Sequence, residues 1–451
     1  MELSQTARIT VIGAGVSGTA LALFARELGK KVFVSEERDG LSSEAIERFK
    51  KADIEWEAGG HSERAFDTDI LLLSSGIPPY ASCVRKAELK GVPVVGEMDF
   101  VAPHIQGALV GITGSNGKST LTALSGHLLQ KAGFKTGIGG NIGEAASLFT
   151  KEAFDYVVLE LSSFQLYWAH DLKSAVAAVT NLAPDHIDWH GSYEAYVAAK
   201  AKILSLQDPS GWGIVQDRDY EVLQVKKPDR TVVLSWEEKP RNAAEGHLFM
   251  GREAAVLRLG GQEKLLFRYE DTTLLGSHNL ENIAMALAAA HLLRVGIPDV
   301  RKALADFKPL PHRCELVATI DGVAYVDDSK GTNVAASVTA MTSVKGRKIV
   351  ILGGKGKGED YGLLAETVVK EADAAILMGV EKGRIEAALK KVGYTPAYGV
   401  ENMEEAVSLA RTLARPGMVV LLSPACTSWD MYESYKKRGE HFRAVVQSLG
   451  G

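Results

Sequence analysis

The glycine-rich stretch GITGSNGKST, residues 111–120, carries the residue types that bind a nucleoside triphosphate. Backbone N–H groups of such a turn surround phosphate oxygens, Lys118 can reach the β- and γ-phosphates, and Ser119 can bind the accompanying Mg²⁺. The spacing departs from the common P-loop, because Gly111 stands one residue earlier than that pattern requires and Gly114 lies in between. A short apolar strand before the loop and an apolar helix after it favour a phosphate-binding site.

The next apolar strand ends in an acidic residue that could bind the same metal. The stretch YVVLELSSF, residues 156–164, places Glu160 at a strand end, and carboxylate oxygens are preferred ligands of Mg²⁺. A glutamate at a strand end is common, so Glu160 gains its significance from Lys118 upstream. The two stretches together predict a site for ATP and its metal.

A second group of candidate metal ligands follows in one loop. Residues 180–191, TNLAPDHIDWHG, contain two aspartates and two histidines: Asp185, His186, Asp188 and His190. A capped, solvated turn explains the same residues equally well, and the pattern does not separate the two interpretations. The Ala-rich helix at 195–204 then carries Lys200 and Lys202, which as isolated lysines would be exposed to solvent.

Near the N-terminus, three glycines with the spacing GxGxxG directly follow a β-branched run: Gly13, Gly15 and Gly18. This pattern lets the backbone approach a pyrophosphate at a helix N-terminus, and Glu36 at the end of the next strand could hold a ribose. Close packing of a helix on a strand is the structural alternative. An NAD-linked oxidoreductase fits this loop, as would any nucleotide diphosphate, but that hypothesis leaves 111–120 and Glu160 unused.

Four polar loops occupy the C-terminal third of the chain: PHR at 311–313, YVDDSKGTN at 325–333, GGKGKGEDY at 353–361 and SPACTSWDMY at 423–432. Each is an ordinary loop when taken singly. A parallel α/β sheet has its ligand crevice at the carboxyl ends of its strands, so the four loops together predict one site. Arg313, at a joint between domains, could move onto a phosphoryl group during its transfer.

Strand–turn–helix units must position these residues. Short β-branched runs enter glycine turns three times: at 8–18, 108–119 and 348–358. The expected fold class is α/β with three domains, namely a Rossmann-like N-terminal domain, a central P-loop ATPase-type domain with a mostly parallel sheet, and a Rossmann-like C-terminal domain. The expected boundaries are 1–97, 98–311 and 312–451. Within the central domain, residues 246–270 alternate with period 2 around Gly260 and Gly261, which predicts an antiparallel hairpin.

Length and composition exclude several classes of protein. The 451 residues exceed the usual size of one domain. The 51 Lys and Arg against 56 Asp and Glu give a net charge of −5, which predicts no nucleic-acid partner. The lack of an apolar run of about 18 residues predicts no membrane partner. Three scattered cysteines support neither a disulfide framework nor a closed zinc site, so we expect a cytoplasmic protein.

The motifs and their order resemble the Mur ligases, ATP-dependent amide-forming enzymes of peptidoglycan precursor synthesis, over essentially the whole chain. GITGSNGKST is similar to that family's version of the P-loop, which accounts for the extra residue. The glycines at 13–18 argue against the branches that add lysine, diaminopimelate or the final dipeptide. ELSSFQL at 160–166 and SPACTSWDMYESYKKRGEHF at 423–442 resemble the branch that adds D-glutamate to UDP-N-acetylmuramoyl-L-alanine.

The resemblance implies a role for each domain. The UDP-linked substrate would be bound by the first domain and adjoining residues: Val16, Ser17, Ser35, Glu36, Gly76, Asn141, Ser162 and Gln165. ATP would be bound mainly by the central domain: Gly114, Ser115, Asn116, Gly117, Lys118, Ser119, Thr120, Asn279, Asn282, Arg313 and Asp328. The third domain would close over ATP and bind D-glutamate: Thr332, Lys357, Ser428 and Tyr435.

The resemblance also implies cofactors and catalytic groups. Two Mg²⁺ ions would accompany ATP, with metal-site positions at Ser119, Glu160, His186 and Lys200, and the lysine matching Lys200 is carbamylated in the family. The catalytic residues would be Lys118, His186, Lys200 and Arg313. The implied protein is a monomer with small-molecule substrates. Another Mur ligase or a folylpolyglutamate synthase-like enzyme would share the ATP site, and a regulatory nucleotide-binding module would need no third-domain loops.

Overall fold

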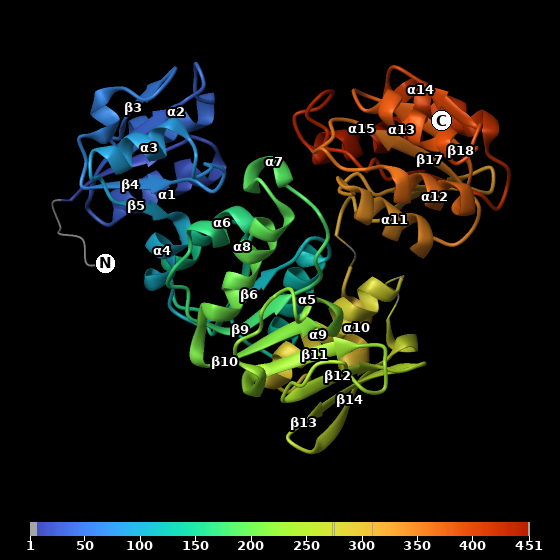
Figure 1. The fold of residues 1–451 in the computed structure, drawn as a ribbon, viewed down its shortest axis with the longest axis horizontal. Coiled ribbons are helices and arrows are strands. Elements are labelled where there is room, and N and C mark those ends of the chain that lie inside the picture. The colour runs from blue at the N-terminus through green and yellow to red at the C-terminus, as the bar shows by residue number, and fades with distance from the viewer. Residues whose placement is uncertain (1–6, 273, 275, 309, 450–451) are drawn as a thin grey trace.

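The chain folds into three β-sheets that follow one another in sequence. The structure, a computed structural model, describes residues 7–449 except 273, 275 and 309. In Figure 1 the N-terminal sheet is blue, the central sheet runs from cyan to yellow-green, and the C-terminal sheet is orange to red. The central part lies between and below the other two in that view.

The N-terminal sheet has five parallel strands in the order β3-β2-β1-β4-β5. The strands are β1 (Arg8–Ile12), β2 (Lys31–Glu36), β3 (Glu55–Ala58), β4 (Ile70–Leu73) and β5 (Val94–Gly96). The helices are α1 (Val16–Glu27), α2 (Ser43–Lys51), α3 (Ser82–Leu89) and the 3-10 turn Glu63–Phe66. The chain reverses its direction of travel between β1 and β4, so the loops after these two strands meet at one ligand crevice.

The central sheet has nine strands in the order β14-β13-β12-β11-β10-β9-β6-β8-β7. They are β6 (Ala108–Thr113), β7 (Thr136–Gly140), β8 (Tyr156–Glu160), β9 (Ser174–Val179), β10 (Gln207–Gln216), β11 (Thr231–Ser235), β12 (Gly246–Met250), β13 (Ala254–Leu259) and β14 (Gln262–Arg268). Only the β12–β13 and β13–β14 pairs are antiparallel. The predicted hairpin is therefore confirmed, and its turn has φ values of 57° and 72° at Gly260 and Gly261.

The helices of this part cover both faces of its sheet. They are α4 (Glu97–Val101), α5 (Lys118–Lys131), α6 (Ser163–Trp168), α7 (Ile187–His190), α8 (Tyr193–Ser205), α9 (Ser277–Leu292) and α10 (Val300–Asp306). Short 3-10 turns lie at Ala102–His104, Ala146–Thr150, Asp217–Asp219, Pro228–Arg230 and Tyr269–Asp271. Helix α9 is rich in alanine, and this small side chain lets α9 pack closely against α5 over the sheet.

The C-terminal sheet has six strands in the order β15-β16-β20-β17-β18-β19. They are β15 (Glu315–Ile320), β16 (Val323–Asp327), β17 (Lys348–Gly353), β18 (Ala372–Met378), β19 (Ala397–Gly399) and β20 (Val419–Leu422), and only the β15–β16 pair is antiparallel. The helices are α11 (Val334–Ser343), α12 (Gly362–Glu371), α13 (Lys382–Lys391), α14 (Met403–Leu413) and α15 (Tyr435–Ser448).

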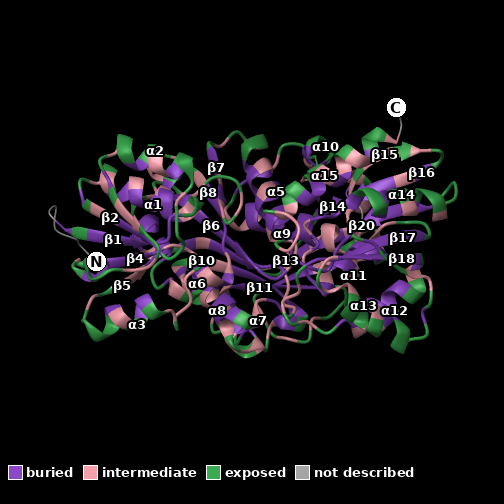
Figure 2. Ribbon diagram, turned by 90° about the horizontal axis from the view of Figure 1, so that it is seen from above, coloured by how far each residue is buried: buried purple, intermediate pink, exposed green. Residues whose placement is uncertain are grey.

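The buried strands form a continuous layer, and the exposed residues lie mostly on the outer helices (Figure 2). This mixture of parallel sheets and covering helices confirms the expected α/β class. The strands of the three sheets fall inside 1–97, 98–311 and 312–451, and we retain these boundaries as a proposal. Among the described residues, no helix combines the length and the apolar character that crossing a membrane requires.

Candidate active site

The glycine loop joins β6 to α5 and is fixed by tight backbone packing. Gly117 begins α5 in the left-handed conformation, with φ of 84°, which glycine adopts without strain. Gly114 has φ of 136°, and a Cβ at this position would collide with the Thr180 hydroxyl. The Ser115 hydroxyl donates to Ala183 O at 2.9 Å, which ties the loop to the segment after β9. The free N–H groups at the start of α5 therefore sit in a preformed turn suited to phosphate.

Two lysines meet at this loop. Lys118 Nζ donates to Gly114 O at 2.8 Å and to Ser115 O at 2.7 Å, while Lys200 Nζ donates to Gly114 O at 2.7 Å. Lys200 is only 2% exposed, so the expectation of a solvated lysine is wrong for this residue. Burial, followed by the nearby Lys118 charge, lowers the pKa of Lys200 well below its usual value.

A cavity of about 850 Å³ opens in front of the loop, between the central and C-terminal sheets. It collects most of the residues that the resemblance assigned to ATP, metal and D-glutamate, together with Asn141, which it assigned to the UDP-linked substrate. They are Ser115, Asn116, Gly117, Lys118, Ser119, Thr120, Asn141, Glu160, His186, Asn279, Arg313, Asp328, Thr332, Lys357 and Tyr435. Gly114, Asn282, Lys200 and Ser428 do not line it. Lys200 lies behind Gly114, and Asn282 lies against Gly117.

Two cations from the C-terminal part reach the hydroxyl group of Ser119. Arg313 Nη2 donates to Ser119 Oγ at 2.9 Å, and Lys330 Nζ donates to the same oxygen at 2.8 Å. Burial and the adjacent Arg313 lower the pKa of Lys330 to about 7. The carboxyl edge of β16 therefore faces the start of α5, and positive charge surrounds the place where a terminal phosphate would lie.

Glu160 is the buried acid of the cavity. Its Oε1 accepts a hydrogen bond from Asn141 Nδ2 at 2.9 Å, whereas Oε2 is buried without a hydrogen-bond partner in the described part of the chain. Burial opposes ionisation, but Lys118 and Lys330 lower the pKa of Glu160 below its usual value. A buried carboxylate oxygen with no partner, next to the Ser119 hydroxyl in the cavity wall, fits a hard cation such as Mg²⁺.

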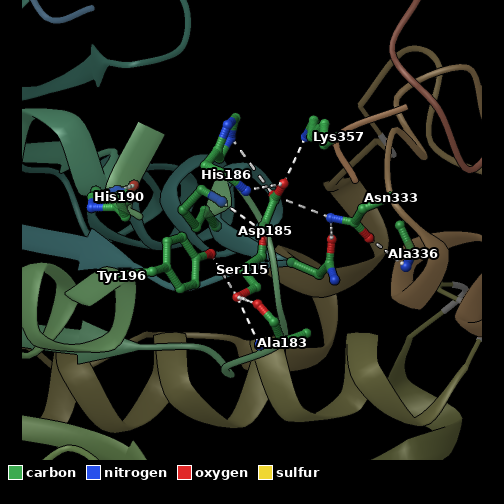
Figure 3. A network of polar contacts seen from close by, with 12 residues as sticks. Ser115, Ala183, Asp185, His186, His190, Tyr196, Asn333, Ala336 and Lys357 are labelled. Carbon is green, nitrogen blue, oxygen red and sulfur yellow. Dashed lines mark hydrogen bonds and ion pairs between the residues drawn. The ribbon is translucent and has the colours of Figure 1, made fainter. Parts of the chain in front are cut away.

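Asp185 links the central loop to the C-terminal part (Figure 3). Its Oδ1 accepts from Lys357 Nζ at 2.7 Å, and its Oδ2 accepts from Asn333 Nδ2 at 3.3 Å. The Asp185 and Lys357 side chains are only 8% and 9% exposed. Although burial favours the neutral acid, the Lys357 charge lowers the pKa of Asp185 to about 2. A buried ion pair thus holds the two parts of the cavity together.

His186 follows Asp185 in the left-handed conformation, with φ of 53°. Its ring packs edge-on against Phe164, with ring centres 4.8 Å apart. Burial lowers the pKa of His186 to about 3, which keeps the imidazole neutral and therefore able to bind a metal. His190 instead hydrogen-bonds Ser163 Oγ at 2.9 Å, away from the cavity lining.

The remaining C-terminal candidates are spread over three loops. Asp328 is buried and accepts from Ser423 Oγ at 2.7 Å and from Cys314 N at 3.2 Å. Burial raises the pKa of Asp328 to about 7. Tyr435 begins α15 and lines the cavity, with Lys330 Nζ 5.3 Å from its ring centre. Ser428 is buried and does not line the cavity. Its assignment to D-glutamate stays a prediction.

The glycine turn after β1 already holds an anion of the chain itself. Glu36 Oε2 accepts from Ala14 N at 2.7 Å, and Arg38 binds both carboxylate oxygens of Glu36 at 3.0 Å. Burial opposes ionisation, but the Arg38 hydrogen bonds outweigh it and lower the pKa of Glu36 to about 2. Ser35 is fully buried, where its hydroxyl donates to Glu57 Oε1 at 2.7 Å.

The other residues assigned to the UDP-linked substrate form two groups, one accessible to a ligand and one already engaged in hydrogen bonds within the chain. Val16 is 84% exposed, Gly76 is also exposed, and Ser17 is half-buried, all at the crevice after β1 and β4. Ser162 and Gln165 cap α6 reciprocally, with Ser162 Oγ accepting from Gln165 N at 3.1 Å. The first group is accessible to a ligand as it stands, whereas the second is occupied by helix capping. Their assignments stay predictions.

Two polar residues reach these sites although no role was assigned to them from sequence. Lys330 lies in the stretch YVDDSKGTN, and its position beside Asp328 and Thr332 was the available signal. Arg38 follows Glu36 by two residues at the end of β2, and its guanidinium is largely exposed at the first crevice. These local signals are weak, because the shape of each site depends on distant segments.

Together, a phosphate-binding loop, a buried acid and cations arriving from a third α/β unit define a nucleotide-dependent ligase. Three family models match the chain: the MurD N-terminal domain at 8–83, the Mur ligase middle domain at 112–290 and the Mur ligase, glutamate ligase domain at 312–426. The chain belongs to the Mur ligase family, whose members are ATP-dependent amide-forming enzymes that use Mg²⁺. The alternative of an NAD-linked oxidoreductase is thereby set aside.

Full-length relatives share more than a third of the sequence. A UDP-N-acetylmuramoylalanine--D-glutamate ligase of Koribacter versatilis is 37% identical over 446 residues, covering 98% of this chain and 97% of the relative. One of the same name from Christiangramia forsetii is 36% identical over 449 residues, covering 98% and 99%. The fold is similar to that of the UDP-N-acetylmuramate-alanine ligase MurC of Thermotoga maritima, with a TM-score of 0.62 at 20% identity over 98% of this chain and 100% of the other.

Proposed function

We propose that this enzyme joins D-glutamate to UDP-N-acetylmuramoyl-L-alanine, with ATP cleaved to ADP and phosphate. The contact of Arg313 and Lys330 with Ser119 supports the ligase chemistry, because two cations of the C-terminal domain reach the phosphate-binding turn of the central domain. The full-length relatives named as D-glutamate ligases support the choice of amino acid. The protein would act on small molecules as a cytoplasmic monomer.

The first step activates a carboxylate. A carboxylate and an amine do not condense spontaneously in water, so the L-alanyl carboxylate attacks the γ-phosphorus of ATP, forms an acyl phosphate and releases ADP. The two reactants are both anions and repel each other. Lys118 and Arg313 supply positive charge around the transferring phosphoryl group, which is the largest contribution expected in such reactions. The bound phosphate anions would favour the protonated form of Lys330.

The second step forms the amide. The neutral amine of D-glutamate attacks the acyl carbon, a tetrahedral intermediate collapses, and phosphate leaves with the bonding electron pair. The proton that the nitrogen loses goes to the departing phosphate. Thr332, Lys357, Ser428 and Tyr435 would bind D-glutamate, with the Lys357 ammonium group pairing with one of its carboxylates. Because Lys357 is now paired with Asp185, D-glutamate would compete with that carboxylate. Closure of the third domain over the cavity would keep water away from the acyl phosphate.

The metal assignments follow from the chemistry of the side chains. Ser119 and Glu160 would hold the Mg²⁺ of ATP, and His186 with a carbamylated Lys200 would hold a second Mg²⁺. These ions would screen the repulsion between the carboxylate and the γ-phosphate. An ammonium group cannot bind Mg²⁺, but a neutral amine that adds CO₂ becomes an anionic oxygen ligand. The buried position of Lys200 favours that neutral amine.

A phosphate-release assay tests this proposal. The enzyme is mixed with ATP, Mg²⁺ and UDP-N-acetylmuramoyl-L-alanine, and a panel of amino acids is added one at a time. We expect phosphate release with D-glutamate alone, and not with L-glutamate, L-alanine, L-lysine or diaminopimelate. Release with a different amino acid would assign the protein to another branch of the family, and release with folate substrates would assign it to a folylpolyglutamate synthase activity.

A further inference from the structure

Two tryptophans of the central part hold one loop of the N-terminal part. Trp168 Nε1 donates to Ile77 O at 3.1 Å, and Trp189 Nε1 donates to Gly76 O at 3.0 Å. The two acceptors are consecutive carbonyl groups in the loop that follows β4. Two donors on adjacent carbonyl groups fix the tilt of the loop as well as its position, because neither hydrogen bond tolerates a large change of angle.

Side-chain packing reinforces these two hydrogen bonds. Gly96, the last residue of β5, lies so close to Trp168 that a Cβ at this position would collide with the Trp168 side chain. Tyr80, further along the same loop, donates from its hydroxyl to Asp188 O at 3.2 Å. Three hydrogen bonds therefore dock the loop at 74–80 on α6 and α7, and the close approach of Gly96 to Trp168 fixes the neighbouring end of β5.

The same docking reaches the cavity. Trp189 lies on α7, and its backbone N–H donates to His186 O at 3.1 Å. The Phe164 ring stands between the two side chains, with its centre 4.7 Å from that of Trp189 and 4.8 Å from that of His186. A shift of the loop would therefore move α7, and α7 begins beside the His186 imidazole.

We propose that Trp168 and Trp189 are positioning residues that set the angle of the N-terminal domain relative to the cavity. The inference rests on the proposed function, because it takes the loop at Gly76 as part of the UDP-substrate site. The substrate spans the two domains, and its carboxylate must approach the γ-phosphate to about 3–3.5 Å. The indole N–H groups maintain that alignment. Through α7 they also keep the His186 side chain in position relative to the substrate.

If the two tryptophans served only to pack the domains together, their N–H groups would not be needed. Trp→Phe replacement separates the two explanations, since phenylalanine retains an aromatic ring and removes only the donor and part of the bulk. If alignment is the role, the variants bind UDP normally but react slowly. We expect Trp168→Phe and Trp189→Phe each to lower kcat roughly three- to tenfold, with the Kd for UDP unchanged within about twofold. Trp212→Phe, on β10 and outside this contact, is the matched control and should keep wild-type kcat.

A second measurement uses the unmodified enzyme. UDP is added without ATP, and amide hydrogen exchange is followed by mass spectrometry. We expect slower exchange in peptides covering 163–168 and 187–191, although UDP itself would contact only the N-terminal domain. Protection confined to residues 8–96 would overturn the inference, as would wild-type kcat in a folded Trp168→Phe/Trp189→Phe double variant. The hydrogen-exchange measurement tests the inference even if the double variant is unstable.

The two proposals fail separately. If the wild-type enzyme releases no phosphate with UDP-N-acetylmuramoyl-L-alanine and D-glutamate, the proposed function is wrong. If it does, and the double variant equals it in kcat, only the positioning role is wrong. A parallel loss of kcat and of UDP affinity would also overturn that role, because it would mean that the tryptophans merely stabilise the binding loop.

Discussion

The amino groups of Lys118 and Lys200 donate to one carbonyl oxygen, that of Gly114, at 2.8 and 2.7 Å. Two buried ammonium groups at this separation would repel each other, so the arrangement favours one charged and one neutral lysine. Burial lowers the pKa of both lysines, and Glu160 and Asp185 oppose the change at both, but only the pKa of Lys200 falls well below its usual value. Lys118 is thus suited to remain a cation for phosphate, and Lys200 to react as a free amine.

Replacing Lys200 by alanine should remove the carbamate and lower kcat at least about 100-fold, because a metal ligand is lost. Short carboxylic acids such as acetate should restore part of the activity by supplying the missing oxygen ligand. The measurement is phosphate release with and without acetate. Wild-type enzyme in ¹³C-labelled bicarbonate should also give a carbamate carbon signal that the variant lacks.

Lys202→Ala is the matched control for this experiment. Lys202 lies on the same helix, and its Nζ donates to Tyr167 O at 2.6 Å, away from the cavity. It should keep near wild-type activity and the carbamate signal. An unaffected Lys200→Ala enzyme, or a wild-type enzyme without any CO₂-labile adduct, would remove the carbamate from the mechanism.

Replacing Lys118 by alanine should lower kcat by about three orders of magnitude, because it deletes fixed positive charge beside the transferring phosphoryl group. UDP binding should not change, since the first crevice is separate. Phosphate release and calorimetric UDP binding measure the two effects. Lys131→Ala, at the far end of the same helix, should behave like wild type. Full activity in Lys118→Ala would show that the glycine loop does not bind the reacting triphosphate.

Replacing Lys357 by alanine should raise the KM for D-glutamate about tenfold or more, because a charge-assisted contact is lost. The change would also leave Asp185 buried without its ammonium partner, which should raise the pKa of Asp185 from about 2. Initial rates at varied D-glutamate give the KM. Lys355→Ala, two residues away and exposed, should have a normal KM, and an unchanged KM in both variants would contradict the assignment.

The buried acid Asp328 should make the stability of the protein depend on pH. Its pKa is raised from 3.8 to about 7 in the folded protein, so between these values the folded state holds a proton that the unfolded state has released. The contribution of Asp328 to the stability of the wild-type protein therefore falls as pH rises from about 4 to 7. Asp328→Asn cannot ionise and should gain up to about 4 kcal/mol relative to wild type by pH 8, and nothing at pH 4.

Thermal unfolding of both proteins across pH 4–8 checks this prediction. The difference in melting temperature should grow with pH and then level off above pH 7. A constant offset would mean that Asp328 does not titrate in this range.

Local features of the site could be predicted from sequence. The glycine loop at 111–120 and the hairpin at Gly260–Gly261 are determined by nearby residues, since glycine adopts the positive φ values of these turns without strain. Glu160 was placed at a strand end by its apolar run alone. Most of the predicted ATP residues accordingly meet in one cavity.

Contacts between distant segments could not be predicted in the same way. Lys330 and Ser119 are 211 positions apart, and only the packing of two domains brings them together. Lys200 looks like a solvated helix residue until its helix is laid against β6, which buries it. Ser162 and Gln165 show the converse: the family resemblance assigns them to the substrate, whereas in the structure they form a capping box at the start of α6.

The Glu36 carboxylate at the first glycine turn has a consequence for selectivity. The Glu36 carboxylate already accepts a hydrogen bond from Ala14 N. Its negative charge would therefore repel a second anion from the deepest part of the turn. A diphosphate has to lie further out, over the exposed Val16 and the half-buried Ser17. Nicotinamide dinucleotides place their pyrophosphate deep in such a glycine turn, so compounds that resemble them should be poor inhibitors of this enzyme. Uridine-based compounds could still bind at the accessible surface over Val16 and Ser17.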